Sequence, residues 1–239
     1  MGRAFEYRRA AKEKRWAKMS KLFPKLGKQI TLAARNGGPN PELNPLLRMA
    51  IQNAKAANLP KDNIEAAIKR ATSKEEKDLE EIVYEGYGPH GVALMIECTT
   101  DNPVRTVANL RSYLTRSGGS LGTTGSVGYL FERRGVFRVS AAGLNIEDLE
   151  LELIDHGLEE LFPEEDELVI FTPYEEFGTM QKALESRGIE VKSANLQRFP
   201  TAYKDLTAEQ RADMQKLLDK MDEDDDIQAV YHTMSEEEA

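Results

Sequence analysis

The sequence predicts a multi-domain α+β protein, with an N-terminal three-helix domain followed by two small α/β-sandwich domains, the second inserted in the first. Three observations support this fold class. Apolar residues recur at helical spacing through the first 75 residues, strand and helix patterns alternate from Glu81 onward, and the two regions carry opposite net charge. A chain of 239 residues can bury one large core or two to three small ones.

The first predicted helix is indicated by apolar residues spaced three and four apart, and the run from Asn36 to Pro39 ends it. Pro24 either marks the true start of this helix or kinks a helix that begins earlier. The residues that share its apolar face are Met19, Phe23, Leu26, Ile30 and Ala33.

Two further helices follow in the same region. The second begins with Asn44 as its N-cap and Pro45 at its first position, and it ends at Pro60. Asp62 and Glu65 resemble a capping box at the start of the third, short helix. Ile64, Ile68 and Ala71 share one face of that helix.

The net charge of −9 hides a strong asymmetry. Residues 1–77 hold 18 Lys and Arg against 7 Asp and Glu, a balance of +11, whereas the remaining residues hold 14 against 34, a balance of −20. We interpret this as a basic module for a polyanion beside an acidic body, with charged helix surfaces as the alternative.

The basic side chains are densest near the N-terminus, where residues 3–21 include eight Lys and Arg with Phe5, Tyr7 and Trp16 between them. Such cations neutralise phosphates, and aromatic rings stack on unpaired bases. The stretch has no clear apolar face, which favours a mobile arm over a packed helix. The alternative is a solvated terminus whose aromatic residues dock on the body. The predicted nucleic-acid-binding residues are Arg3, Arg8, Arg9, Lys12, Lys14, Arg15, Trp16, Lys18, Lys21, Lys25 and Lys28.

Other features bound the class of protein. No apolar run approaches the length of a membrane span, and no signal-peptide stretch follows the basic N-terminus, so we expect a cytoplasmic protein without membrane contact. Cys98 is the only cysteine and lies in an apolar run, which fits a reducing compartment and a core position.

The acidic body begins with a buried strand, "GVALMIECTT", and a helix with Asn102 as N-cap, Pro103 at its first position and Gly118 after its C-terminus. "SVGYLFERRGVF" is predicted as the next strand. This unit has too few strands until the C-terminal helix and a strand at Ile227–Thr233 return to it, so the residues between are predicted to be an inserted domain.

The inserted domain is predicted to hold a strand at Val136–Val139, a helix from Ile146 to His156, the strand "DELVIFTP", the helix "YEEFGTMQKALESRG" and the strand "IEVKSANLQRF". The predicted boundaries are a helical domain of residues 1–77, a discontinuous α/β domain of residues 78–132 and 200–239, and the insertion of residues 133–199. The charged stretch Ser73–Leu79 separates the basic module from the acidic body.

We find no motif for catalysis. The glycines of Gly86–Gly91 precede a strand, whereas phosphate-binding glycines follow one, so a tight turn between two strands is expected. Arg105 is predicted to bind a carboxylate, bind an RNA phosphate or face solvent. The loop Arg116–Ser126 is interpreted as a flexible connector, with a phosphate contact as the weaker alternative.

Metal and cofactor sites are likewise not predicted. His90, His156 and His232 lack the spacing of metal ligands. The carboxylate runs Glu164–Glu167 and Asp222–Asp226 are interpreted as solvated surface or weak cation attractors. The sequence therefore predicts no catalytic residue, no metal and no cofactor.

Three stretches carry a resemblance to a known family. They are "KLGKQITLAARNGGPNPELNPLLRMAIQNAKAANLPKDNIEAAIKRAT", "YEGYGPHGVALMIECTTDNPVRTVANLRSYLTRSGGSLGTTGSVGYLFERRGVF" and "DDDIQAVYHTM". The chain resembles the YebC family of bacterial regulatory proteins, although its opening "MGRAFEYRR" diverges from the usual one. The resemblance implies a three-domain cytoplasmic protein that is a transcriptional regulator binding promoter DNA or a ribosome-associated translation factor.

The function predicted from these observations is a non-enzymatic regulator of gene expression that binds nucleic acid, with DNA as the first choice. The alternative is a ribosome-associated translation factor that binds ribosomal RNA. A remote alternative is an enzyme that uses Gly88–Thr106 on a phosphorylated small molecule, and a scaffold acting through protein contacts alone is a third class. The oligomeric state is left open.

Overall fold

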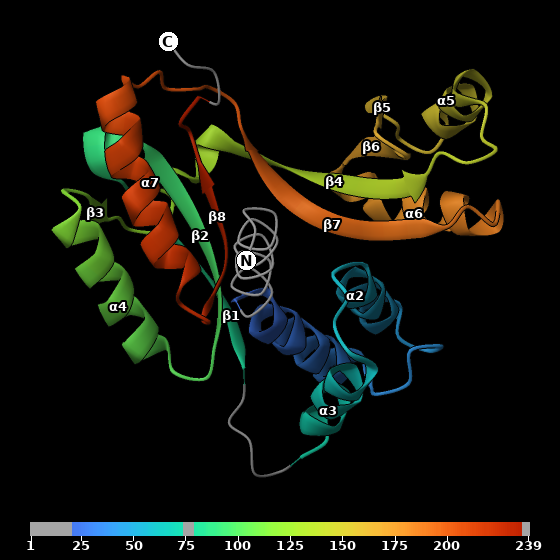
Figure 1. Ribbon diagram of the computed structural model, residues 1–239, viewed down its shortest axis with the longest axis horizontal. Coiled ribbons are helices and arrows are strands. Elements are labelled where there is room, and N and C mark those ends of the chain that lie inside the picture. The colour runs from blue at the N-terminus through green and yellow to red at the C-terminus, as the bar shows by residue number, and fades with distance from the viewer. Residues whose placement is uncertain (1–20, 74–78, 236–239) are drawn as a thin grey trace, which may run out of the picture. The chain divides into compact units, whose positions relative to one another are not determined.

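The computed structural model describes residues 21–73 and 79–235 (Figure 1). These residues form two compact units. The first contains the described residues up to Gly128 together with those from Tyr203 onward, and the second is Tyr129–Ala202. The chain thus leaves the first unit once and returns to it.

The first unit begins with a helical module. The described part of its first helix covers residues 21–37 and contains Pro24, and α2 (Pro45–Ala56) and α3 (Lys61–Ala71) follow. The three helices bury a shared core of aliphatic side chains, which includes Ile30, Leu47 and Ile64.

Asn44 fixes the entry to α2, as predicted. Its Oδ1 accepts a hydrogen bond from the backbone N–H of Leu47 at 3.1 Å, and Pro45 is the first helical residue. The Asn44 amide also donates to the carbonyls of Ala33 and Gly38, both at 2.8 Å. One side chain therefore holds the end of the first helix and the start of the second, where helix termini leave backbone groups without intrahelical partners.

The predicted capping box of the third helix is wrong. The N-cap of α3 is Pro60, with no side-chain hydrogen bond to the cap, and Asp62 lies inside the first turn. Glu65 pairs instead with Lys61 one turn away. The negative charge of Asp62 still complements the positive end of the helix dipole.

The rest of the first unit is an antiparallel sheet covered by two helices. Its strands are β1 (Glu80–Tyr87), β2 (Ala93–Thr100), β3 (Ser120–Leu121) and β8 (Ile227–His232), in the order β3-β1-β2-β8. Helices α4 (Pro103–Arg116) and α7 (Ala208–Asp222) contribute to one core with β2 and β8 (Figure 1). The predicted return of the C-terminal helix and strand is confirmed by the pairing of β8 with β2.

The glycines of Gly86–Gly91 lie at the turn between β1 and β2, as predicted. A single 3-10 turn, Pro89–Gly91, joins the strands, and the Gly88 N–H donates to the Val92 carbonyl at 2.8 Å. Gly91 has a φ of 73°, a left-handed conformation that glycine adopts without steric cost. Asn102, Pro103 and Gly118 likewise occupy the predicted cap positions of α4.

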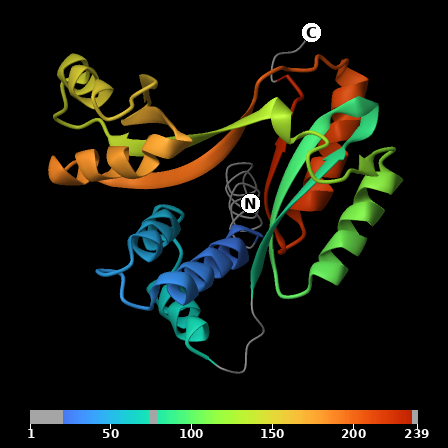
Figure 2. The same cartoon turned by 180° about the vertical axis from the view of Figure 1, so that it is seen from behind.

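The second unit is a four-stranded antiparallel sheet with the order β5-β6-β4-β7. Its strands are β4 (Phe131–Ser140), β5 (Glu160–Glu164), β6 (Glu167–Pro173) and β7 (Val191–Pro200), and its helices are α5 (Ile146–Ile154) and α6 (Phe177–Ser186). Figures 1 and 2 show β4 and β7 side by side along their length. The βαββαβ order is that of ferredoxin-like folds.

Two details of the second unit differ from the sequence prediction. The strand predicted as "SVGYLFERRGVF" and the strand predicted at Val136–Val139 are one strand, β4, and a 3-10 turn at Gly128–Leu130 precedes it. A Cβ at Gly135 would lie 2.6 Å from Phe177 and from Thr172, so glycine lets this strand pass close under α6. The carboxylate run Glu164–Glu167 is the hairpin between β5, which was not predicted, and β6.

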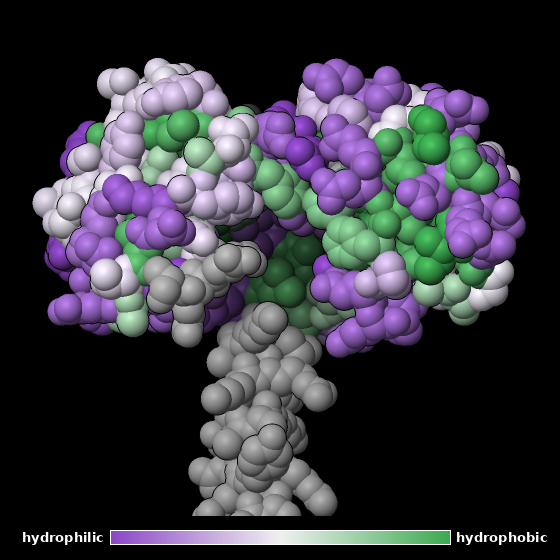
Figure 3. All heavy atoms as spheres, turned by 90° about the horizontal axis from the view of Figure 1, so that it is seen from above, coloured by the Kyte–Doolittle hydropathy of each residue, from purple (hydrophilic) through white to green (hydrophobic). Residues whose placement is uncertain are grey.

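Hydrophilic side chains cover much of the surface in the space-filling view, interrupted by apolar patches (Figure 3). Exposed apolar side chains occur on both units, for example Leu46 at 56% and Leu151 at 70% exposure. Within the described residues, no helix combines the length and apolar character that a membrane crossing requires.

Candidate nucleic-acid interface

Eight of the eleven predicted nucleic-acid-binding residues lie outside the described residues: Arg3, Arg8, Arg9, Lys12, Lys14, Arg15, Trp16 and Lys18. The other three, Lys21, Lys25 and Lys28, lie on the first helix. Their spacing of four and three residues places them on one face. That face contacts the C-terminal end of α7 and the residues that follow it.

Asp222 binds the first two of these lysines. Its carboxylate oxygens lie 3.3 Å from the Nζ of Lys21 and 2.9 Å from the Nζ of Lys25, and Lys25 is only 7% exposed. Burial alone would raise the pKa of Asp222, but the hydrogen bonds and charges of Lys25 and Lys21 outweigh it and hold the pKa below its ordinary value.

Asp226 binds the third lysine and is the centre of a buried cluster. It is 4% exposed, and its Oδ1 accepts a hydrogen bond from Lys28 Nζ at 2.7 Å. Its Oδ2 accepts from Arg105 Nη2 at 2.7 Å, and from the hydroxyls of Thr100 and Thr106 at 3.1 and 3.0 Å. These donors counteract the effect of burial, so the pKa of Asp226 is lowered.

Asp224 connects the same segment to α4. Its Oδ2 accepts from the Tyr113 hydroxyl at 3.0 Å and from the Asn109 amide at 3.2 Å, while its Oδ1 accepts from the backbone N–H of Asp226 at 3.0 Å. Burial, followed by the hydrogen bond to Asp224, raises the pKa of Tyr113 to about 12. The neutral phenol therefore stays a donor throughout the physiological range.

The interpretation of the run Asp222–Asp226 as solvated surface is wrong for buried Asp226 and half-buried Asp224, whereas Asp222 is exposed and binds lysines at the surface. The run joins the first helix, β2 and α4 to the end of α7. Arg105, whose partner the sequence left open, binds carboxylates: Asp226, and Asp101 at 2.9 Å.

The loop Arg116–Ser126 is also held in place, contrary to its interpretation as a flexible connector. Glu85, 8% exposed, accepts hydrogen bonds from the backbone N–H groups of Gly125, Val127 and Gly128 at 2.7, 2.7 and 2.8 Å. Successive backbone N–H groups form anion-binding concavities in many proteins. Here the anion is a side chain of β1, so the protein itself fills the position that a phosphate would take.

Further cations of the helical module lie on α2 and α3, and they are not among the predicted nucleic-acid-binding residues. Arg48 and Lys55 on α2 and Lys61 on α3 line a groove between the two helices. Lys69 and Arg70 lie farther along α3, and both are exposed. The signal that could have found the groove is the polar spacing of positions 48, 52 and 55 on a helix whose other face is apolar.

The described ranges contain no set of three or more His, Cys, Asp or Glu side chains that could hold a metal ion. His90 contacts Asp213 at 3.3 Å in an exposed pair. Cys98 is buried, and burial together with the nearby charges of Asp224 and Asp226 raises its pKa to about 12, which suppresses the thiolate.

The fold class is that of a multi-domain α+β protein, with a helical module and two antiparallel sheets. The chain belongs to the TACO1/YebC family. The model of the family's N-terminal domain matches residues 3–74, and the model of its second and third domains matches residues 79–234.

Relatives and a solved structure agree with this assignment. A probable transcriptional regulatory protein of Flavobacterium johnsoniae is 52% identical over 237 residues, covering 99% of this chain and all of that protein. A protein of the same description from Cytophaga hutchinsonii is 54% identical over 238 residues and covers both chains fully. The crystal structure of a conserved hypothetical protein from Aquifex aeolicus, 41% identical, superposes with a TM-score of 0.78 over 92% of this chain and 91% of that one.

Proposed function

We propose that this protein is a non-enzymatic regulator of gene expression, as the names of its relatives suggest, and that it binds DNA through the basic N-terminal module. The observation that carries the proposal is the charge division: +11 over residues 1–77 against −20 over the rest. A polyanion is attracted to the first region and repelled by the second, so contact is one-sided.

The ion pairs of the first helix narrow the proposed interface. Lys25 and Lys28 already neutralise Asp222 and Asp226, and a phosphate would have to displace those carboxylates to bind them. The proposed phosphate contacts are therefore made chiefly by Arg3, Arg8, Arg9, Lys12, Lys14, Arg15 and Lys18, with Trp16 available for stacking.

The test is a fourfold charge reversal, Arg8→Glu, Arg9→Glu, Lys12→Glu and Arg15→Glu. If the arm makes on the order of 5–8 phosphate contacts, the log of wild-type affinity for duplex DNA falls with log salt at a slope of roughly −4 to −7. The reversal should weaken binding and flatten this slope. Unchanged affinity and slope would show that the arm is not the binding surface.

A matched control separates the position of the charges from the net charge. Reversing Arg111, Arg116, Lys182 and Lys216, which are exposed on the acidic remainder of the chain, changes the net charge by the same amount. This variant should keep the wild-type salt slope. Equal loss in both variants would mean that only the overall charge matters and would contradict an interface at the arm.

Ribosomal RNA is a polyanion too, and the proposal of DNA is tested against it in cells. The protein is crosslinked in growing cells and the attached nucleic acid is sequenced. Recovery of discrete promoter fragments supports a transcription factor. Enrichment of ribosomal RNA at one site overturns the choice of DNA and supports a translation factor that uses the same arm.

A further inference from the structure

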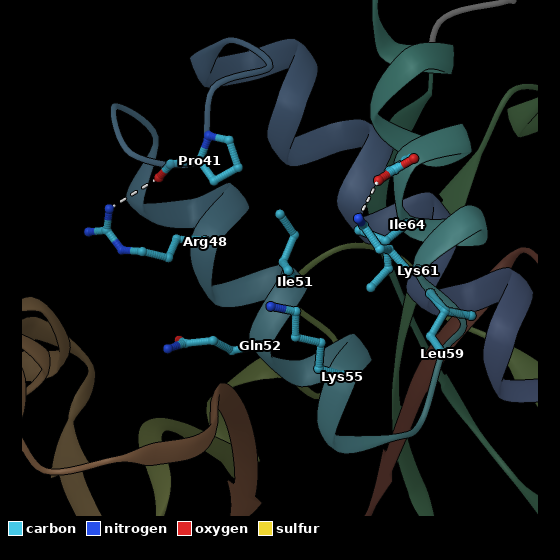
Figure 4. A pocket seen from close by; sticks show the side chains of 9 residues that line it. Pro41, Arg48, Ile51, Gln52, Lys55, Leu59, Lys61 and Ile64 are labelled. Atoms are coloured by element: carbon cyan, nitrogen blue, oxygen red, sulfur yellow. Dashed lines mark hydrogen bonds and ion pairs between the residues drawn. The ribbon is translucent and has the colours of Figure 1, made fainter.

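A groove of about 540 Å³ opens between α2 and α3 of the helical module. Its most buried lining residues are Leu59 and Ile64, 5% and 6% exposed, and half-buried Ile51 adds to this apolar surface. Figure 4 shows Ile51 projecting from α2 into the space beside α3, near Lys61. Pockets that hold organic ligands span roughly 300–1,000 Å³, so the groove has room for large apolar side chains.

The rim of the groove is cationic. Arg48, Lys55 and Lys61 line it, against the single carboxylate of Glu65. Arg48 is held at the rim because its Nη1 donates to the carbonyls of Pro41 and Glu42 at 3.1 and 3.3 Å. The Lys61–Glu65 pair is 3.4 Å long between side chains 86% and 63% exposed, and such pairs hold each other weakly.

This combination indicates the chemistry of the occupant. Unpaired nucleobases are bound by stacking on aromatic rings or guanidinium planes and by hydrogen bonds to their edges. The apolar lining here is aliphatic, and Gln52 is the one amide among the lining residues. An aliphatic groove between helices with a charged rim is the arrangement that binds amphipathic helices, whose apolar anchors enter the groove while opposite charges meet at its edge.

We propose that the groove between α2 and α3 is a docking site for an acidic amphipathic segment of a partner protein. One or two large apolar side chains of that segment contact Ile51, Leu59 and Ile64. Its Asp or Glu residues pair with Lys55 and Lys61. The residues of this site differ from those of the proposed DNA interface, so the protein would bind nucleic acid and a protein partner through different residues of the same basic module.

The test begins with a random 16-residue peptide library displayed on phage and selected on the full chain. We expect enrichment of sequences with apolar residues three or four positions apart among Asp and Glu. Enriched sequences are synthesised with a fluorophore, and their affinity is measured by anisotropy. Lys55→Glu with Lys61→Glu should weaken binding on the order of tenfold or more, because opposite charges at the rim become like charges.

The matched control is Lys69→Glu with Arg70→Glu. It makes the same change of charge on exposed residues of α3 that do not line the groove, and it should leave peptide affinity within about twofold. Ile51→Gln tests the apolar contact with side-chain volume roughly kept, and it should weaken binding without changing the circular dichroism spectrum. Enrichment of no acidic apolar motif, or equal loss in the rim and control variants, overturns the proposal.

Two further measurements exclude other occupants. If Lys55→Glu with Lys61→Glu lowers affinity for a single-stranded oligonucleotide more than the control does, the groove is part of the nucleic-acid surface and the proposal is overturned. If it changes the molar mass measured by light scattering, a second copy of the chain occupies the groove, with the same consequence. The arm reversal should leave peptide binding intact, so failure of the docking site and failure of the DNA interface are distinguishable.

Discussion

Asp226→Asn is expected to destabilise the first unit strongly, although it changes only charge and one acceptor atom. The buried carboxylate neutralises Lys28 and Arg105 and accepts from two threonine hydroxyls. The asparagine amide offers one acceptor oxygen, and its NH₂ group faces donors. Lys28 loses the counter-charge of Asp226, and Arg105 keeps that of Asp101.

The magnitude follows from the exposure of the partners. Removing one partner of a fully buried ion pair costs about 3–5 kcal/mol. The side chain of Asp226 is 6% exposed, but those of Lys28 and Arg105 are 22% and 47% exposed, so water screens part of the loss. We expect about 2–3 kcal/mol at pH 7, which for a unit of this size lowers the unfolding temperature by roughly 5–10 °C.

The assay is urea unfolding followed by circular dichroism, with Asp225→Asn as the control. Asp225 is exposed and adjacent, so the control makes the same charge change and should lie within about 0.5 kcal/mol of wild type. A double-mutant cycle with Lys28→Met then isolates the pairwise energy. If Asp226→Asn is as stable as Asp225→Asn, the cluster does not hold the helical module, and the argument is refuted.

Three further predictions concern titratable side chains of the first unit. The pKa values of Asp222 and Asp226 are held below 3.8, so their contribution to stability is complete above that pH and is lost as the pH falls through the lowered values. The urea midpoint of the wild-type protein should therefore drop more steeply than that of Asp226→Asn between about pH 4 and 2. Cys98, with a pKa of about 12, should react with iodoacetamide at pH 8 more than about a hundredfold slower than a free thiol, and it should react readily once urea unfolds the unit. Rapid labelling of the native protein would contradict the burial of this thiol. Glu85→Gln places an amide donor against backbone N–H groups and should lower the free energy of unfolding by about 1–3 kcal/mol. It should also speed proteolytic cleavage between Gly122 and Gly128. Unchanged cleavage would show that other contacts hold the loop.

The sequence predicted well where local chemistry decides the structure. Asn44 and Asn102 were predicted as N-caps because a short polar side chain before proline can accept a hydrogen bond from the free backbone N–H groups of a helix start. The buried strand β2 was predicted because apolar residues lie on both of its faces, although Glu97 is charged. The return of β8 to the first sheet was predicted because that unit lacked strands without it.

Long-range partners decided the features that the sequence did not predict. The carboxylates of Asp222 and Asp226 face lysines 197 and 198 positions away, and no periodicity records such a pairing. The sequence did not predict the two-residue strand β3 or the hydrogen bonds of Glu85 for the same reason, because each depends on a loop that folds against β1. The groove was missed because its apolar surface and its cations come from two helices and join only in space.

The place of β8 in the first sheet has a consequence for the order of events during synthesis. Strand β2 has β1 on one side and β8 on the other, and β8 emerges from the ribosome after the whole of Tyr129–Ala202. The second unit has all four of its strands available earlier and can fold while the first is still missing an edge. Until Ile227–His232 arrives, β2 exposes an apolar edge able to pair with another nascent chain. The unit that begins first along the chain is therefore the last to be completed.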